Sequence, residues 1–287
     1  MALDASLVGH EVGAVSARCD ARWLMAYAAG VPDPRPALYD TTGALPVHPL
    51  FPVAPEWMLL TSHRATPSGM PADEVARGVH SHHDVIHHRS LVAGETVDVR
   101  ATVIGVDRRP AGATLSLLFE ATDSERATIW RTRFTSTFLG VELVGEPQAM
   151  TADWPEQPSL VDTATVSADP VATTNSHVAV TDAHVYSECA RIWNPIHTDV
   201  TAARRAGLDA PILHGTATLA RAVSLVTALA EVPIDRVARV AGGFAAMVPL
   251  DSTIQVRLLA AGDRGLHFDV LNEQGQSAIR RGYIGFA

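Results

Sequence analysis

One layout occurs twice along the 287 residues, and this repetition limits the fold more than any other feature of the sequence. In residues 20–40 ("DARWLMAYAAGVPDPRPALYD") we expect a short helix that ends at Gly30, before a loop broken by prolines. Residues 181–199 ("TDAHVYSECARIWNPIHTD") follow the same order. The residues that can cap the two helices are Asp20 in the first segment and Thr181 or Asp182 in the second. The chain is therefore expected to contain two related units in tandem.

Four strand-like runs close each half of the sequence. β-Branched and aromatic residues nearly alternate with polar ones along them, which favours antiparallel pairing. We expect the two sheets to join edge to edge, because a free edge strand promotes aggregation. The runs cover residues 78–89, 95–107, 113–123 and 127–139 in the first half, and residues 237–248, 252–261, 265–272 and 277–286 in the second.

Only the second half offers a long helix between its loop and its strands. In residues 215–231, apolar residues at Leu219, Val223 and Val226 recur at helical spacing, so this segment predicts a helix that a curved sheet wraps. The corresponding segment of the first half, residues 54–69, is short and broken by proline and glycine. A sheet wrapped around a central helix, doubled in tandem, is a double hotdog, an α+β fold. Here the helix of the first half is degenerate.

A segment of low complexity separates the two halves. Residues 145–167 are rich in Pro, Asp, Thr and Ser and lack periodicity, which is typical of a linker. The linker divides the chain into an N-terminal hotdog unit, residues 1–144, with the degenerate helix, and a C-terminal unit, residues 168–287. The candidate site described below lies in the C-terminal unit.

Composition and charge exclude several other classes of protein. A net charge of −9 without a long basic run argues against nucleic-acid binding. The most apolar stretch, residues 217–233, contains Arg221 and Glu231 and is too short and too polar to span a membrane. The N-terminus shows no secretory signal, so a cytoplasmic location is expected. Cys19 and Cys189 have no metal or redox spacing and are interpreted as buried free thiols.

Five of the thirteen histidines lie in the stretch "HSHHDVIHHR", which begins at His80. In a regular strand alternate side chains share a face, which would place His80 and His82 on one side and His83 and His87 on the other. Apart from Asp84, the stretch offers no acidic or cysteine residue at a zinc-like spacing. We interpret it as an edge or surface strand whose imidazoles hydrogen-bond to neighbours or water. No metal site is expected.

Two motifs in the second half carry a resemblance to a known family. Residues 194–199 read "NPIHTD", and residues 211–222 read "PILHGTATLARA". They resemble the MaoC-like, (R)-specific enoyl-thioester hydratase and dehydratase family. Its consensus is approximately Ser-Gly-Asp-x-Asn-Pro-Leu-His-x-Asp, followed by Pro-Ile-Leu-His-Gly at the start of the hotdog helix. The resemblance implies a lyase that acts on acyl groups bound to coenzyme A (CoA) or to an acyl carrier protein. We expect no cofactor, and a homo-oligomer in the form of a dimer.

The resemblance also implies a role for each residue of these motifs. His197 corresponds to the catalytic histidine, and imidazole suits acid/base chemistry because it titrates nearest neutral pH. Gly215 opens the helix, where unpaired N–H groups and the positive end of the helix dipole can stabilise the thioester oxygen as it gains enolate charge. Asn194 either holds the catalytic water or only shapes the turn. His214 is expected to support the substrate site by packing.

One position departs from the family pattern. Where the family has an aspartate, five residues before the histidine, this sequence has Ile192, which cannot accept a proton or hold a water molecule. Glu188 lies one helical turn earlier and is the nearest acidic candidate in the second half. Asp33 lies in the corresponding loop of the first half. Asp199 is interpreted as a helix N-cap rather than as a replacement acid.

Three functions remain open on this basis. The first is a hydratase or dehydratase of acyl thioesters with His197 as the principal acid/base group. The second is a hotdog enzyme of altered chemistry, such as single-base elimination, isomerisation or thioester hydrolysis, in which Ile192 forms an apolar wall beside the substrate. The third is a non-catalytic acyl-binding protein that kept the cavity. The presence of both motifs together favours the first two.

Overall fold

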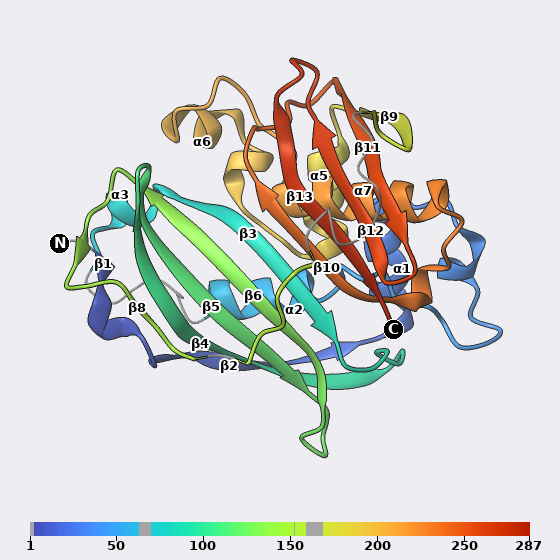
Figure 1. Cartoon of the computed structure of the whole chain (residues 1–287), viewed down its shortest axis with the longest axis horizontal. Coiled ribbons are helices and arrows are strands. Elements are labelled where there is room, and N and C mark those ends of the chain that lie inside the picture. Colours follow the sequence, from blue (N-terminus) through green and yellow to red (C-terminus); the bar gives the residue numbers. More distant parts are fainter. Residues whose placement is uncertain (1–2, 63–69, 152, 159–168) are drawn as a thin grey trace.

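The computed structural model describes residues 3–62, 70–151, 153–158 and 169–287, and the two halves of the chain lie side by side in it (Figure 1). Its helices are α1 (Ala21–Gly30), α2 (Val53–Ser62), α3 (Ala72–Val75), α5 (Asp182–Ala190), α6 (Val200–Arg205) and α7 (Gly215–Leu229). Its strands are β1 (Leu3–Asp4), β2 (Glu11–Cys19), β3 (Gly78–His87), β4 (Glu95–Arg109), β5 (Gly112–Thr122), β6 (Thr128–Leu139), β7 (Leu143–Val144), β8 (Gln148–Ala149), β9 (Ala172–Val178), β10 (Val237–Phe244), β11 (Ser252–Gly262), β12 (Gly265–Leu271) and β13 (Ser277–Phe286).

One antiparallel sheet of 11 strands runs through both halves. Its order is β2-β4-β5-β6-β3-β10-β13-β12-β11-β9, with β8 beside β4. The strands of each half stay together, and β3 meets β10 at the junction, where Val85 pairs with Val240. Both of these valines are fully buried. The junction confirms the prediction that the two sheets join edge to edge. A separate parallel pair is formed by β1 and β7.

The two halves cover their sheets with helices of different length. α7, of 15 residues, packs against β10, β11, β12 and β13, and its residues Leu219, Val223 and Val226 are fully buried. α2, of 10 residues, packs against β2 and β4. Residues 63–69, which belong to the segment predicted to be broken, lie outside the described residues. Within the described residues, α7 is therefore the longer of the two helices.

The first helices of the two halves pack directly against each other. The closest approach is at Gly30 of α1, where an added Cβ would lie 2.8 Å from the Cβ of Cys189 on α5. Gly30 is therefore needed for this contact as well as for the end of α1. Asp20 caps α1, as predicted, by accepting a hydrogen bond at 2.9 Å from a backbone N–H of the first turn. Between the two helices, the hydroxyl groups of Tyr27 and Tyr186 lie 3.4 Å apart.

The structure differs from the sequence-based expectation in several strands, including the two-residue strands β1, β7 and β8, which were not predicted. β2 and β9, which precede the first helix of each half, were not among the predicted runs. Both are edge strands, and in the β9 sequence "ATTNSHV" only Val178 is buried, so no apolar alternation marks it. The interpretation of β3 as an edge or surface strand is wrong, because β3 lies between β6 and β10. Its histidines are tolerated there because part of the strand faces a cavity.

The predicted linker runs along the outside of the sheet where it is described. Gln148–Ala149 forms β8 beside β4, and the indole of Trp154 donates a hydrogen bond to Asp84 at 2.8 Å. The rest of the predicted linker, residue 152 and residues 159–167, lies outside the described residues. Cys19 is buried and Cys189 is partly buried, and neither forms a disulfide.

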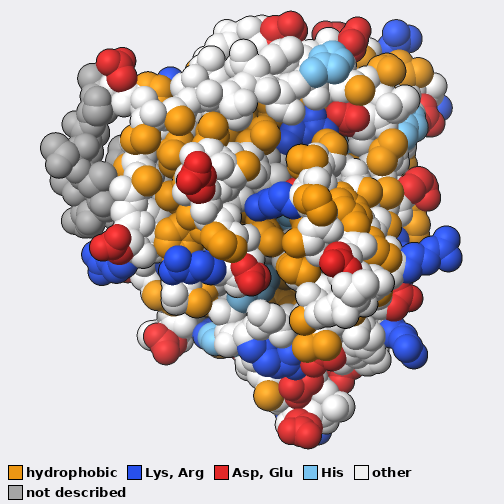
Figure 2. All heavy atoms as spheres, turned by 90° about the vertical axis from the view of Figure 1, so that its right-hand side faces the viewer, with side chains coloured by type: hydrophobic (Ala, Val, Ile, Leu, Met, Phe, Trp, Pro, Cys, Tyr) orange, Lys and Arg blue, Asp and Glu red, His pale blue; other side chains and the backbone are white. Residues whose placement is uncertain are grey.

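Two global features bear on possible partners. Within the described ranges, no helix is long and apolar enough to cross a membrane. Figure 2 shows one face of the molecule, on which basic and acidic side chains are interspersed among hydrophobic ones and no extended basic region is visible. That face therefore offers no surface of the kind that nucleic-acid binding needs.

Candidate active site

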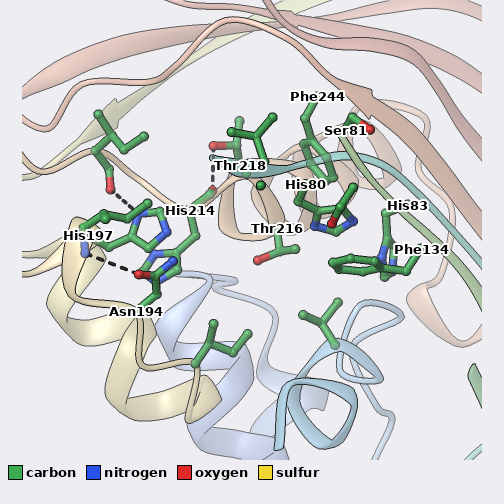
Figure 3. A pocket seen from close by; sticks show the side chains of 18 of the residues that line it. His80, Ser81, His83, Phe134, Asn194, His197, His214, Thr216, Thr218 and Phe244 are labelled. Carbon is green, nitrogen blue, oxygen red and sulfur yellow. Dashed lines mark hydrogen bonds between the residues drawn. The ribbon is translucent and has the colours of Figure 1, made fainter. Parts of the chain in front are cut away.

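A cavity of about 560 Å³ is lined by residues from both halves of the chain. Its polar side chains form two groups, which lie on opposite sides in Figure 3 with Thr216 and Thr218 between them. One group contains Asn194, His197 and His214, and the other contains His80, Ser81 and His83. Most of the remaining lining is apolar and includes Leu115, Leu117 and Phe134. An apolar cavity with a few converging polar groups is the usual form of a small-molecule site.

The loop after α5 brings His197 to this cavity. Arg191 ends α5 in the left-handed conformation, at φ 58°, which turns the chain. Asn194 then caps a short 3₁₀ turn, Pro195–His197, by accepting a hydrogen bond from the backbone N–H of Ile196 at 3.4 Å. Asp199 caps α6, which confirms its interpretation as an N-cap. Asn194 thus has a structural contact and also lines the cavity.

His197 is held as a neutral imidazole. Its Nδ1 lies 2.8 Å from the carbonyl oxygen of Ile212, so Nδ1 carries the proton and donates. Nε2 is then unprotonated, and it makes no hydrogen bond within the part of the chain that the structure describes. Burial lowers the pKa of His197 to about 4, although the bond to Ile212 favours the charged form. At neutral pH this side chain can accept a proton but has none to give from Nε2.

His214 packs against His197. The two rings are stacked with centroids 3.6 Å apart and planes at 25°. The His214 Nε2 lies 3.2 Å from the hydroxyl of Ser187 on α5. Burial, and then the neighbouring His197, hold the pKa of His214 well below its usual range. Two stacked imidazoles cannot both be charged in such surroundings, so His214 is neutral where it packs against His197.

Gly215 places the start of α7 at the cavity wall. His214 stands at the N-cap position and makes no side-chain capping bond, so the first N–H groups of α7 receive no acceptor from it. An added Cβ at Gly215 would lie 2.9 Å from Cδ1 of Phe244 on β10. Glycine therefore permits both the packing of Phe244 and the approach of a ligand to the helix start.

Ile192 lines the same cavity and is 2% exposed. The two acidic residues considered as substitutes lie elsewhere. Glu188 is exposed and accepts a hydrogen bond from the indole of Trp193 at 3.2 Å. Asp33 is buried in an ion pair with Arg35 and does not line the cavity. Neither carboxylate supplies an acid to the space beside Ile192.

Glu56 on α2 is a cavity residue that the sequence analysis missed. It is 2% exposed, and Trp130 and Thr132 on β6 both donate to its Oε1, the first of them at 3.0 Å. Burial raises the pKa of Glu56 to about 8, although these two hydrogen bonds favour the charged form. A signal was present in the sequence, because Glu56 is the one charged residue in the apolar stretch 53–60.

The histidines of β3 do not lie on the predicted faces. The pairing of β3 with β6 shifts register between His80 and His82, which is a bulge at Ser81. His80 and His83 therefore share the cavity face, with ring centroids 5.5 Å apart, while His82 does not line the cavity. The described residues contain no group of three or more His, Cys, Asp or Glu side chains that could hold a metal ion.

Comparison with known proteins gives both a family match and a shared fold. Residues 161–279 match the family described as "MaoC like domain". The chain is similar to a MaoC-like dehydratase from Phytophthora capsici, at 19% identity over 97% of this chain and 96% of that chain, with a TM-score of 0.81. It is also similar to the full-length peroxisomal multifunctional enzyme type 2 from Drosophila melanogaster, at 21% identity and a TM-score of 0.77. That match covers 96% of this chain and 48% of the Drosophila chain, so this chain spans about half the length of that enzyme.

A third similar structure bears on the fold itself. It is a conserved hypothetical protein from Mycobacterium tuberculosis that has a double hotdog fold. The identity is 12%, over 97% of this chain and 95% of that chain, and the TM-score is 0.60. These likenesses show a shared fold, and they confirm the prediction of an α+β double hotdog.

Proposed function

We propose, from the premise that the C-terminal half of this chain is a MaoC-like domain, that the protein is an acyl-thioester hydratase or dehydratase. Its substrate is an acyl group carried by CoA or by an acyl carrier protein. The observation that carries the proposal is the pairing of His197, whose Nε2 is free to accept a proton, with the uncapped start of α7 at Gly215. Both line one cavity.

The start of α7 is the proposed site for the thioester carbonyl. Enolate formation places negative charge on the thioester oxygen, and unpaired backbone N–H groups at a helix start stabilise such charge. Gly215 has no side chain to block the approach. The expected contact is a hydrogen bond from the Gly215 N–H to that oxygen.

His197 is proposed to act as the only acid/base group. In dehydration, Nε2 takes the proton from C2 of a 3-hydroxyacyl thioester, and the electron pair forms the enolate held at Gly215. The enolate then collapses as the C3–O bond breaks, and the same proton passes from Nε2 to the leaving hydroxyl. The products are water and the 2-enoyl thioester. One base can serve both atoms only if the C2 hydrogen and the C3 oxygen lie on the same face of the substrate.

The distribution of carboxyl groups supports a single base. Among the described residues that line the cavity, Glu56 is the only acidic one. Its carboxyl binds Trp130 and Thr132 in the first half of the chain, whereas His197 belongs to the second. Ile192 adds an apolar wall to the cavity and helps to exclude water. Exclusion of water favours elimination, or isomerisation through the same enolate, over addition of water.

The test is an assay of purified protein on crotonyl-CoA, longer enoyl-CoAs and the corresponding 3-hydroxyacyl-CoAs. His197→Ala is expected to lower kcat/KM by about 10²- to 10⁴-fold, because it removes the acid/base group. The matched control is His184→Ala, which removes an exposed histidine on α5 and should leave the rate unchanged. For the wild type, kcat/KM should be level near neutral pH and fall as the pH drops through about 4, where His197 gains a proton.

Two results would contradict the proposal. Full activity of His197→Ala would place the chemistry elsewhere. A wild-type protein that binds acyl-CoA but converts none of these thioesters would instead be an acyl-binding protein.

The setting of the enzyme is part of the same proposal. We expect a homodimer in the cytoplasm that binds neither nucleic acid nor membrane. The net charge of −9 and the interspersed charges in Figure 2 support the absence of nucleic-acid binding. Light scattering of the purified protein tests the dimer, and a monomer at micromolar concentration would contradict it.

A further inference from the structure

The polar side chains on the N-terminal side of the cavity, His80, Ser81 and His83, take no part in the chemistry of the proposed function. Among them, His83 on β3 is fully buried, lines the cavity and is seen beside Phe134 in Figure 3. Neither ring nitrogen of His83 has a hydrogen-bond partner in the described part of the chain. A buried polar group without a partner costs about 1–3 kcal/mol. Its presence in a cavity therefore points to a ligand that supplies the partner.

The neighbouring His80 differs from His83 in that it has partners within the protein. His80 lies on the same face, and its ring is stacked on Phe134 at 3.9 Å and packs against Phe244 at 4.6 Å. Its Nε2 donates to the carbonyl oxygen of His82 at 3.0 Å. Burial lowers the pKa of His83 to about 3, so that ring is neutral, with one nitrogen that donates and one that accepts. Of these two histidines, His83 is the one with both nitrogens available to a ligand.

The carboxyl group of Glu56 lies in the same corner of the cavity. His83 pairs with Phe134 of β6, and Thr132, two residues earlier on β6, shares the face of Phe134. Diagonal neighbours of this kind lie about 7–8 Å apart across an antiparallel pair. Thr132 donates to Oε1 of Glu56, and Trp130 donates to the same oxygen. Oε2 is therefore left for the proton that burial keeps on this carboxyl at neutral pH.

We propose that His83 and Glu56 form a second subsite, which hydrogen-bonds an uncharged oxygen substituent, a hydroxyl or a carbonyl, on the acyl chain away from the thioester. The proposal rests on the proposed function, because His197 and Gly215 fix the thioester end. The acyl chain then runs from these residues toward β3 and β6. Leu115, Leu117 and Phe134 line its path. Plain alkyl chains leave His83 without a partner, and charged chain ends lose more hydration than this site returns.

The experiment measures binding of saturated thioesters, which cannot be hydrated, by calorimetry. Octanoyl-CoA is compared with a series of hydroxyoctanoyl-CoAs. Each member of the series carries one hydroxyl group, at a different carbon of the far half of the chain. We expect at least one isomer to bind about tenfold more tightly than octanoyl-CoA, which corresponds to one additional well-paired hydrogen bond. In His83→Leu the ratio of the two affinities, hydroxyoctanoyl-CoA over octanoyl-CoA, should fall to about one. In His82→Leu, whose altered side chain is adjacent in sequence but does not line the cavity, the ratio should persist.

A second pair of variants tests the part of Glu56. Glu56→Gln keeps an oxygen for Trp130 and Thr132 and a donor in place of the acid, so it should keep the ratio. Glu56→Met keeps a similar volume without the donor and should lower the ratio. Melting temperatures check the folding of each variant, and His83→Leu should melt no lower than the wild type, because it removes an unpaired polar group. An unchanged ratio in Glu56→Met would remove Glu56 from the subsite.

The outcomes separate this inference from the proposed function. Equal affinity of the wild type for octanoyl-CoA and every hydroxy isomer would overturn the subsite, whatever the enzyme does with enoyl-CoA. A hydroxyl preference that His83→Leu abolishes, in a protein that turns over no enoyl- or 3-hydroxyacyl-CoA, would support the subsite and overturn the hydratase proposal. A preference that survives in His83→Leu would place the contact elsewhere and also contradict the inference.

Discussion

The loops that follow α1 and α5 occupy corresponding places in the two halves but use their polar side chains differently. The second loop turns His197 toward the cavity with Nδ1 bound to the Ile212 carbonyl. The first loop buries Asp33 in an ion pair with Arg35, and Arg35 also donates to the hydroxyl of Thr227 on α7 at 3.0 Å. In the proposed site the second loop presents His197 to the ligand, whereas the first loop links the two halves through Arg35 and Thr227.

The helices differ in the same way. The first residue of α7 borders the cavity, and farther along α7 the hydroxyl of Ser224 lies 3.1 Å from the Nε2 of His48, in the first half. α2 is shorter than α7, and residues of the first-half strands line the cavity. Under the proposed function, the second half supplies the acid/base group and the helix start, and the first half supplies part of the cavity that holds the acyl chain.

The largest expected effect is on the chemistry of the C-terminal half. Gly215→Val should lower kcat/KM by at least about 10²-fold, because the side chain covers the helix start that stabilises the enolate oxygen. The added Cβ would also lie 2.9 Å from the ring of Phe244, so that ring must shift. The matched control is Gly43→Val in the first half, where an added Cβ meets no atom within 4 Å. Full activity of a folded Gly215→Val would show that the oxyanion site lies elsewhere.

Because Arg35 connects the first loop to α7, its replacement should lower the stability of the protein. Arg35→Leu leaves the carboxylate of Asp33 buried without its partner and should lower the free energy of unfolding by about 3–5 kcal/mol. Burial alone would raise the pKa of Asp33, and the hydrogen bonds from Arg35 and Ser224 together outweigh it and lower the pKa. Arg100→Leu, which breaks an exposed pair with Glu11, should cost less than about 1 kcal/mol. Urea unfolding at neutral pH measures both, and equal losses would contradict the division between the loops.

The smallest effects concern the position of the missing acid. Ile192→Asp should increase hydration of enoyl-CoA by about tenfold or more if the aspartate can hold a water molecule beside His197. Ile192→Asn is the control, because asparagine has the shape of aspartate without its acid. Both variants are assayed below their melting temperatures, because the side chain at this position is buried. Glu188→Gln should be nearly silent, because Glu188 faces solvent. A Glu188→Gln variant as inactive as His197→Ala would restore a two-residue acid/base site.

Local motifs made the C-terminal site predictable. Asn194, His197, His214 and Gly215 lie within 22 residues of one another, and a turn and a helix start bring them together. The surroundings of Glu56 in the N-terminal half depend on distant pairings instead. Glu56 binds Trp130 and Thr132, which lie 74 and 76 residues later in the chain, and no pattern near Glu56 indicates those partners.

The faces of β3 could not be predicted for a related reason. The strict alternation assigned to a regular strand fails at Ser81, because a bulge in the pairing with β6 moves His83 to the face of His80. The edge strands β2 and β9 were not predicted, because most of their side chains are exposed or only partly buried. Such strands need few apolar residues. The edge-to-edge joining of the two sheets, by contrast, followed from the requirement to cover two free edges, whereas the order of the strands within each half was not predicted.

A structure of the wild-type protein with a bound, unreactive 3-hydroxyacyl thioester analogue tests the division of labour most directly. We expect the thioester oxygen at about 3 Å from the backbone nitrogen of Gly215, which is hydrogen-bond distance. C2 should lie beside Nε2 of His197, and the acyl chain should extend toward His83 in the first half. A thioester bound near Asp33, or an acyl chain that stays within the second half, would show that the two halves do not share the substrate in this way.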